Sequence, residues 1–299
     1  MRLSSTRRFR HLAVALAVGG LAATASCSSD GSAPATSSSS AASSAAPTTD
    51  AGAGTYLALG DSVPFGFRGG ATSEYSDADN FVGYPELVGE QLGLDVVNAS
   101  CPGETTGSLL EVTAQSNWCE NSLQPGGGYR TAFPLHVPYA AADQSQLDFA
   151  VQTLTETDDV ELVTLQIGAN DGFLCQQTTA DRCTSPPEVQ NLAASVQANL
   201  DRILKTVREH YDGQVVVVTY YALDYSDQMG TATQVLDAGI AQIAQANGAD
   251  VADGYEAFRS AATEAGGSSV DAGLVLPNDV HPTEEGQRLL ADAVTAVAR

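Results

Sequence analysis

Basic residues are scarce in this chain of 299 residues. Of its 13 lysines and arginines, four (Arg2, Arg7, Arg8 and Arg10) lie within the first ten positions, and the remaining nine face 36 acidic residues. So strong a negative charge repels the phosphates of nucleic acids and of anionic lipids. We therefore expect no nucleic-acid partner and no electrostatic attraction to an anionic membrane.

Several site motifs are also missing. The sequence has no Gly-x-Gly-x-x-Gly, no phosphate-binding loop with its lysine, no Cys-x-x-Cys and no paired histidines. Dinucleotide, nucleotide and zinc sites depend on these patterns, so we expect no cofactor and no metal. The Gly-x-Ser-x-Gly motif is absent too, which argues against the larger α/β-hydrolase fold.

Long apolar runs are lacking as well. The apolar segment 12–25 is shorter than the roughly 20 residues of a membrane-spanning helix, and with the arginines before it predicts a signal peptide over 1–26. Its end fits either an ordinary cleavage site at Ala25 or a lipoprotein box that ends in Cys27. We favour the lipoprotein, because a lone cysteine stands there just before a Ser-rich stretch. The membrane would then be contacted only through this lipid anchor.

The rest of the chain divides in two. Residues 27–54 consist almost entirely of Ser, Ala, Thr, Gly, Pro and Asp, a composition that predicts a disordered linker. Residues 55–299 are long enough for one domain with a sizeable core. The predicted protein is exported, as a cell-surface lipoprotein or as a freely secreted enzyme.

Within that domain, apolar β-branched runs alternate with helical patterns. Such alternation predicts an α/β fold, a three-layer α/β/α sandwich around a central parallel sheet. The carboxyl ends of its strands are where sites form. The expected strands are 55–60, 94–99, 161–167, 214–220 and 249–252, and the expected helices are 82–92, 143–156, 187–210, 231–247 and one that begins after Thr283 as N-cap.

Candidate catalytic residues follow these strands. Ser62, Gly103 and Asn170 each come just after a predicted strand, so the pattern alone brings them to one edge of the sheet. His281 precedes Pro282 at the start of the last helix. Any one of these residues alone would more often be an ordinary turn or loop residue, and it is the set of four that points to acyl transfer.

The four blocks are Gly60-Asp61-Ser62, Cys101-Pro102-Gly103, Gly168-Ala169-Asn170-Asp171 and Asp279-Val280-His281-Pro282. In this order they resemble the SGNH or GDSL hydrolases of the secreted bacterial lipase and esterase type, over residues 55–298. The resemblance implies a flavodoxin-like sandwich, Ser62 as nucleophile and His281 as base. It also implies an oxyanion hole made by the Ser62 and Gly103 N–H groups and the Asn170 side-chain amide.

The sequence departs from that family at one position. The family usually carries Asp three residues before its histidine, and Asn278 stands there. We expect the side chain or backbone carbonyl of Asn278 to orient His281, with Asp279 secondary because an extended segment would not aim it at the ring. Asp61 and Asp171 are interpreted as braces of their turns.

Five cysteines minus Cys27 leave four, which allow three pairings. Export favours disulfides, and local pairing gives Cys101–Cys119 and Cys175–Cys183, with free thiols as the alternative. Residues 115–142 mix aromatics and turn formers without a period. They predict a long loop, either a wall of the site or an irregular excursion.

The function that fits best is an exported, monomeric serine ester hydrolase, a lipase or esterase that acts through an acyl-enzyme on Ser62. Its substrate would be a small-molecule or lipid ester. A carbohydrate O-acetylesterase with the same machinery remains an alternative, as does a catalytically silent surface binding module.

Overall fold

The structure, a computed structural model, describes residues 53–70, 72–122 and 127–299. The described residues from 53 onward form one compact unit. The expected signal peptide, Cys27 and nearly all of the expected linker lie outside the described residues.

The centre of the unit is a five-stranded sheet, and all its strand pairs are parallel. Each predicted strand is present, although the fourth ends at Val218 instead of residue 220. The strands stand in the order β2-β1-β3-β4-β5. Their bounds are β1 Thr55–Gly60, β2 Asp95–Asn98, β3 Val160–Gln166, β4 Gln214–Val218 and β5 Asp250–Ala252.

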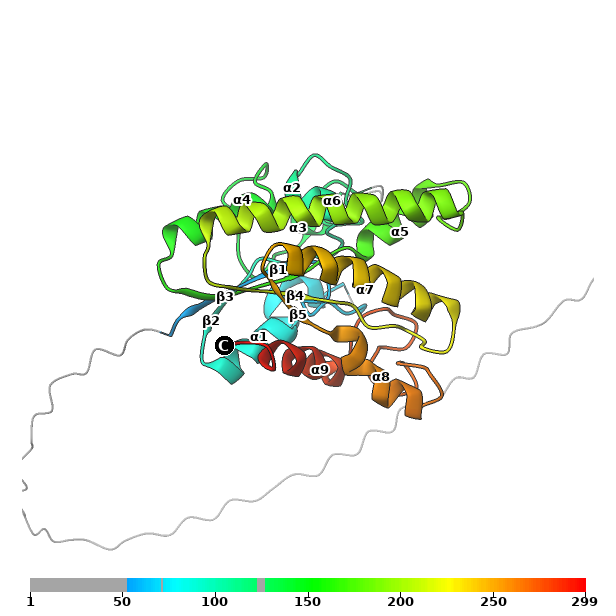
Figure 1. Cartoon of the computed structure of the whole chain (residues 1–299). Helices are drawn as coiled ribbons and strands as arrows, with labels where there is room; N and C mark the ends of the chain where they lie inside the picture. The colour runs from blue at the N-terminus through cyan, green and yellow to red at the C-terminus, as the bar shows by residue number, and fades with distance from the viewer. Residues whose placement is uncertain (1–52, 71, 123–126) are drawn as a thin grey trace, which may run out of the picture. The chain divides into compact units, whose positions relative to one another are not determined.

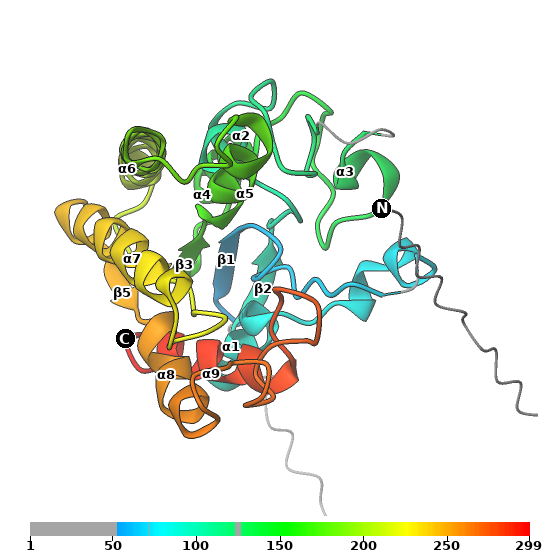
Figure 2. The same cartoon turned by 90° about the vertical axis from the view of Figure 1, so that its right-hand side faces the viewer.

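Helices cover both faces of the sheet, which confirms the predicted three-layer α/β/α architecture (Figures 1 and 2). One face carries α4 Gln146–Glu156, α6 Pro186–His210 and α7 Gln228–Ala246. The other carries α1 Tyr84–Leu92, α8 Gly254–Glu264 and α9 Glu284–Thr295. The shorter helices are α2 Thr106–Leu110, α3 Tyr129–Ala132 and α5 Ala169–Thr178, and two 3-10 turns lie at Glu74–Ser76 and Ala78–Asn80.

The long helices form where apolar residues recur at helical spacing. On α6, five such residues are fully buried against the sheet, as its sequence pattern predicts. Thr283 caps α9 by accepting a hydrogen bond from the Gly286 N–H. Gly286 itself is packed so closely that an added Cβ would lie 2.3 Å from the Leu274 carbonyl oxygen.

The strand order places a topological switch point between β1 and β3. The chain passes from β1 to β2 on one side and then returns to place β3 on the other, so the direction of strand addition reverses at β1 and β3. Parallel α/β sheets bind ligands at this switch point, beyond the carboxyl ends of the strands. Ser62 follows β1 and Asn170 follows β3. No helix among the described residues is both long and apolar enough to cross a membrane.

Candidate active site

Ser62 and His281, 219 residues apart in the sequence, are in hydrogen-bond contact. The Ser62 Oγ lies 3.0 Å from Nε2 of His281. Ser62 stands on the turn after β1 and is partly exposed, whereas His281 comes from the loop before α9. The side chain of Gln287 on α9 donates to the Val63 carbonyl and accepts from the Tyr84 N–H, which joins that helix to the serine turn. A base held at this distance can accept the serine proton.

Asp279 contacts the other nitrogen of the His281 ring, which corrects the expectation that Asn278 orients it. Oδ1 of Asp279 lies 2.5 Å from Nδ1 of His281. The expectation assumed an extended segment, but Asn278 has a left-handed φ of 60° and the Asp279 N–H closes a turn onto the Leu276 carbonyl at 3.2 Å. This turn swings the Asp279 carboxylate onto the ring.

The environment of Asp279 keeps its carboxylate charged. Partial burial by itself would raise the pKa of Asp279, but the contact with His281 and hydrogen bonds from the Gly69 and Val280 N–H groups lower it below its ordinary value. Ser62, His281 and Asp279 thus form a continuous relay of hydroxyl, imidazole and carboxylate. The Phe67 and His281 rings pack in a T-shaped arrangement with their centroids 5.0 Å apart.

Gly103 and Asn170 lie with Ser62 and His281 on one cavity of about 630 Å³. Asn170 is in the first turn of α5 and is 5% exposed. The backbone of Gly103 has φ +86°, a conformation that suits glycine, and an added Cβ would lie 2.5 Å from the Asn117 carbonyl oxygen. The site residues expected from the sequence are therefore brought together, with the exception of Asn278, which is not among the residues that line this cavity.

Two buried carboxylates brace the loops of the site. Asp61 accepts hydrogen bonds from the Val63 N–H at 3.0 Å and from the Tyr220 hydroxyl at 2.5 Å, and burial raises its pKa to about 6. Asp171 accepts from both the N–H and the hydroxyl of Thr106 on α2, and burial likewise raises its pKa to about 6. Each carboxylate fixes the turn that carries a neighbouring site residue.

The four cysteines of the domain are joined as Cys101–Cys119 and Cys175–Cys183, the local pairs. Glu104 is buried beside the first disulfide, and burial raises the pKa of this carboxyl to about 7. Cys101, Glu104 and Cys119 are the one group with ligand-like spacing that is found in the described part of the chain. Its sulfurs are bonded to each other and so are not thiolate ligands.

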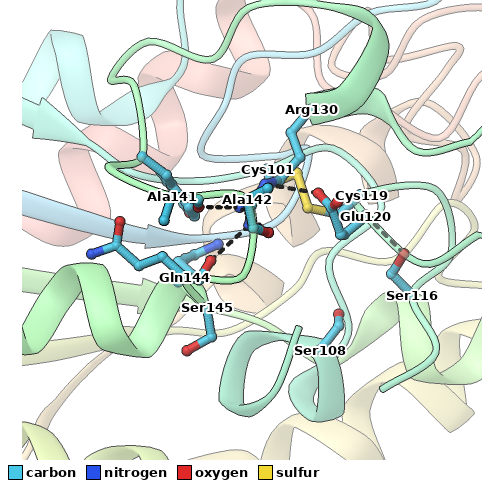
Figure 3. A network of polar contacts seen from close by, with 12 residues as sticks. Cys101, Ser108, Ser116, Cys119, Glu120, Arg130, Ala141, Ala142, Gln144 and Ser145 are labelled. Atoms are coloured by element: carbon cyan, nitrogen blue, oxygen red, sulfur yellow. Dashed lines mark hydrogen bonds and ion pairs between the residues drawn. A yellow bond between two sulfur atoms is a disulfide. The ribbon is translucent and has the colours of Figure 1, made fainter. Parts of the chain in front are cut away.

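The segment 115–142, as far as it is described, contributes Asn117 and Trp118 to the wall of the site and carries the short helix α3. Arg130 pairs with Glu120 at 2.8 Å and donates to the backbone carbonyls of residues 141, 142 and 144, beside the Cys101–Cys119 bridge (Figure 3). Trp118 and Asn117 line the cavity. His136 is directed elsewhere: its Nε2 lies 3.0 Å from the Phe65 carbonyl oxygen.

The rest of the cavity wall is mostly apolar. It is built by the end of β4 and its loop, by α5 and α6, and by α7, through Phe173, Leu192, Leu223, Val235 and Leu236, among others. Five large apolar side chains are exposed on the described residues, and three of them, Val189, Leu223 and Val235, belong to this lining. Apolar surface therefore gathers at the opening of the site.

Comparison with known proteins agrees with this geometry. A profile of the GDSL-like Lipase/Acylhydrolase family matches residues 58–289. A search of curated proteins finds no significant match.

Solved structures are similar to the chain in fold. Phospholipase A1 from Streptomyces albidoflavus NA297 is 21% identical, with 82% of this chain and 99% of that chain covered and a TM-score of 0.51. An extracellular lipase from Streptomyces rimosus is 21% identical, with 83% and 100% covered and a TM-score of 0.50. An acetylxylan esterase from Geobacillus stearothermophilus is 17% identical, with 81% and 93% covered and a TM-score of 0.52. The chain belongs to the GDSL-like lipase and acylhydrolase family and is a carboxylic ester hydrolase.

Proposed function

We propose that the protein is an exported serine ester hydrolase that forms an acyl-enzyme on Ser62. The observation that carries the proposal is the relay from the Ser62 hydroxyl through His281 to the Asp279 carboxylate, with distances of 3.0 and 2.5 Å, at the wall of the cavity. A serine hydroxyl is a weak nucleophile until a base accepts its proton, and the relay supplies that base together with the charge that stabilises it.

In the proposed reaction, the Ser62 Oγ attacks the ester carbonyl carbon while Nε2 of His281 takes the serine proton. The N–H groups of Ser62 and Gly103 and the Asn170 side-chain NH₂ hold the oxyanion that forms. The tetrahedral intermediate expels the alcohol, whose oxygen receives the proton from His281. Water then gives a proton to His281 and attacks the acyl carbon, and the acid leaves as the proton returns to Ser62.

The apolar wall favours an ester with a long acyl or alkyl chain. The cavity falls within the ~300–1,000 Å³ of typical ligand sites, and its lining from α5, α6 and α7 offers mostly hydrocarbon contacts. Burial of each methylene contributes about 0.8 kcal/mol, so each added carbon that reaches this wall improves binding several-fold. A strongly anionic protein would prefer neutral to anionic lipid esters.

Hydrolysis of p-nitrophenyl esters from acetate to decanoate tests this substrate class. We expect kcat/KM to rise with chain length. Leu192→Trp, which fills part of the cavity, should lower kcat/KM for the longer esters more than for the acetate ester. Val82→Trp is the matched control, because Val82 is exposed and is not part of the lining. Activity confined to acetate, with release of acetate from acetylated xylan, would instead favour the carbohydrate O-acetylesterase.

We further propose that the enzyme acts as a monomer outside the cytoplasm, anchored through Cys27. The two disulfides and the N-terminal signal pattern support export, since disulfides persist in oxidising compartments. Cell fractionation tests the anchor: Cys27→Ala should move the enzyme from the membrane fraction to the medium. Wild-type enzyme found in the medium would instead favour a freely secreted protein, and a variant that stays in the membrane fraction would contradict anchoring through Cys27.

A further inference from the structure

We propose that Asn117 is a positioning residue that aligns both non-serine donors of the oxyanion hole. This inference rests on the proposed function. Asn117 touches each donor through a different group. Its backbone N–H donates to the Gly103 carbonyl at 2.8 Å, and its side-chain Nδ2 donates to Oδ1 of Asn170 at 2.8 Å. One residue therefore joins the loop after β2 to the first turn of α5.

The side-chain contact decides which way the Asn170 amide faces. An Asn side chain presents an oxygen acceptor on one side and an NH₂ donor on the other. Because Oδ1 of Asn170 accepts from Asn117, its NH₂ is left to point to the opposite side. That is the orientation in which the amide donates to an oxyanion. A flipped amide would present an oxygen to the developing negative charge and raise the barrier.

Gln177 in turn fixes which way the side-chain amide of Asn117 faces. Its Nε2 donates to Oδ1 of Asn117 at 2.8 Å, which leaves Nδ2 of Asn117 for Asn170. Asn170 and Gln177 are seven residues apart on α5, two helical turns, and so lie on one face of it. The relay thus starts and ends on the same helix, with Asn117 between its two ends.

The backbone contact constrains Gly103. The Asn117 carbonyl oxygen lies 2.5 Å from the position that a Cβ on Gly103 would take. The Asn117 N–H bond to the Gly103 carbonyl fixes the Gly103–Glu104 peptide plane. The close contact beside the α-carbon restricts the backbone torsions of Gly103, which relate this plane to the preceding peptide that carries the Gly103 N–H. The donor geometry is thereby set before substrate arrives, which is how oxyanion holes lower a barrier.

The residues that follow Asn117 hold it in place. Trp118 has φ +120°, a backbone conformation that non-glycine residues rarely adopt and that surrounding structure must enforce. The Trp118 carbonyl accepts from the Tyr129 N–H, Cys119 is bonded to Cys101, and Glu120 pairs with Arg130 (Figure 3). The described part of 115–142 thus serves to hold the oxyanion donors in place.

The relay makes a prediction that a merely structural role does not. Asn117→Asp places an acceptor where a donor stands, so the Asn170 amide turns its NH₂ toward residue 117 and its oxygen toward the cavity. We expect kcat to fall about 10²–10³-fold, the cost of one oxyanion donor, while KM stays within about 2-fold. Asn117→Ala lets the amide adopt both orientations, so that a fraction of the molecules stays competent, and should cost only about 2–10-fold. Asn121→Asp is the matched control, because it adds the same charge to the same loop but on a side chain that donates to the Thr113 carbonyl and not to Asn170. It should leave kcat unchanged.

A double-mutant cycle with Asn170→Ala completes the test, with circular dichroism and thermal melting as fold controls. If the relay acts through Asn170, Asn117→Asp adds less than about 2-fold to the loss in Asn170→Ala. Gln177→Glu, at an exposed position of α5, should lower kcat about 10-fold by turning the Asn117 amide, whereas Thr178→Glu should not. Near-normal kcat in Asn117→Asp, or full additivity of its loss with that of Asn170→Ala, would overturn the role of Asn117 and leave the proposed function standing. Near-normal turnover in Asn170→Ala itself would overturn the oxyanion assignment of the proposed function.

Discussion

Removal of the Asp279 carboxylate should disable the base while leaving the nucleophile in place. Oδ1 of Asp279 lies 2.5 Å from Nδ1 of His281, and both side chains are mostly buried. Without this carboxylate, nothing fixes the tautomer that leaves Nε2 free to accept the serine proton, and the imidazolium loses its counter-charge. Loss of a triad acid costs about 10⁴ in kcat, or about 5.5 kcal/mol at 1.36 kcal/mol per decade.

Two variants of Asp279 separate charge from geometry. We expect Asp279→Ala to lower kcat by about 10³–10⁴, and Asp279→Asn to lower it at least as much, because an amide NH₂ on Nδ1 favours the wrong tautomer. Asn278→Gly is the matched control. It removes the side chain at the position where the family usually has its acid, and glycine keeps the left-handed φ of 60° without strain.

The measurement is kcat for a soluble p-nitrophenyl ester at saturating concentration, with circular dichroism to verify folding. Asn278→Gly should stay within about 3-fold of wild type, since its backbone conformation is preserved. Asp279→Ala that retains a tenth or more of wild-type kcat would show that Asp279 is not the triad acid. Asn278→Gly that loses more kcat than Asp279→Ala would show that His281 is oriented from position 278.

Three further results are expected. Gly103→Ala should both lower kcat and destabilise the fold by about 1–3 kcal/mol, because its Cβ would meet the Asn117 carbonyl at φ +86°; normal activity and melting would contradict this. Reduction of the two disulfides should lower the free energy of unfolding by about 2–4 kcal/mol each, measured by urea titration with and without reductant. Burial raises the pKa of Asp61, Glu104 and Asp171 to about 6, 7 and 6, so these groups take up protons on folding, and stability is lost as pH rises through these values. The free energy of unfolding should thus be at least about 2 kcal/mol larger at pH 5 than at pH 8, and a flat profile would contradict these shifts.

The sheet could be predicted because short apolar runs, most clearly the β-branched ones of β3 and β4, alternate with helical patterns along the domain. Ser62, Gly103 and Asn170 could be predicted as well, because the ends of parallel strands meet at one edge, and His281 could be identified because its block completes the set of four. The helix α5 escaped prediction because its sequence has no apolar stripe and follows Gly168, a residue typical of turns. The helix α8 was not predicted either, although its sequence indicates a helix: Asp253 caps it, and Tyr255, Phe258 and Ala262 follow at helical spacing.

The roles of Asp279, which orients His281, and of Asn117 could not be predicted from the sequence, for a different reason. Whether Asn278 or Asp279 faces His281 depends on the left-handed conformation of Asn278, which the local sequence does not dictate. The contact between Asn117 and Asn170 spans 53 residues and exists only after the loop is closed onto α5. Contacts of this kind follow from tertiary packing, and no periodicity in the sequence encodes them.

The most direct test of the account is covalent labelling of the purified enzyme with a fluorophosphonate, followed by peptide mass spectrometry. We expect one adduct per molecule on the peptide that contains Ser62, loss of ester hydrolysis in parallel with labelling, and neither labelling nor turnover in folded Ser62→Ala. Ester hydrolysis that persists in Ser62→Ala, or an adduct on another residue, would contradict it.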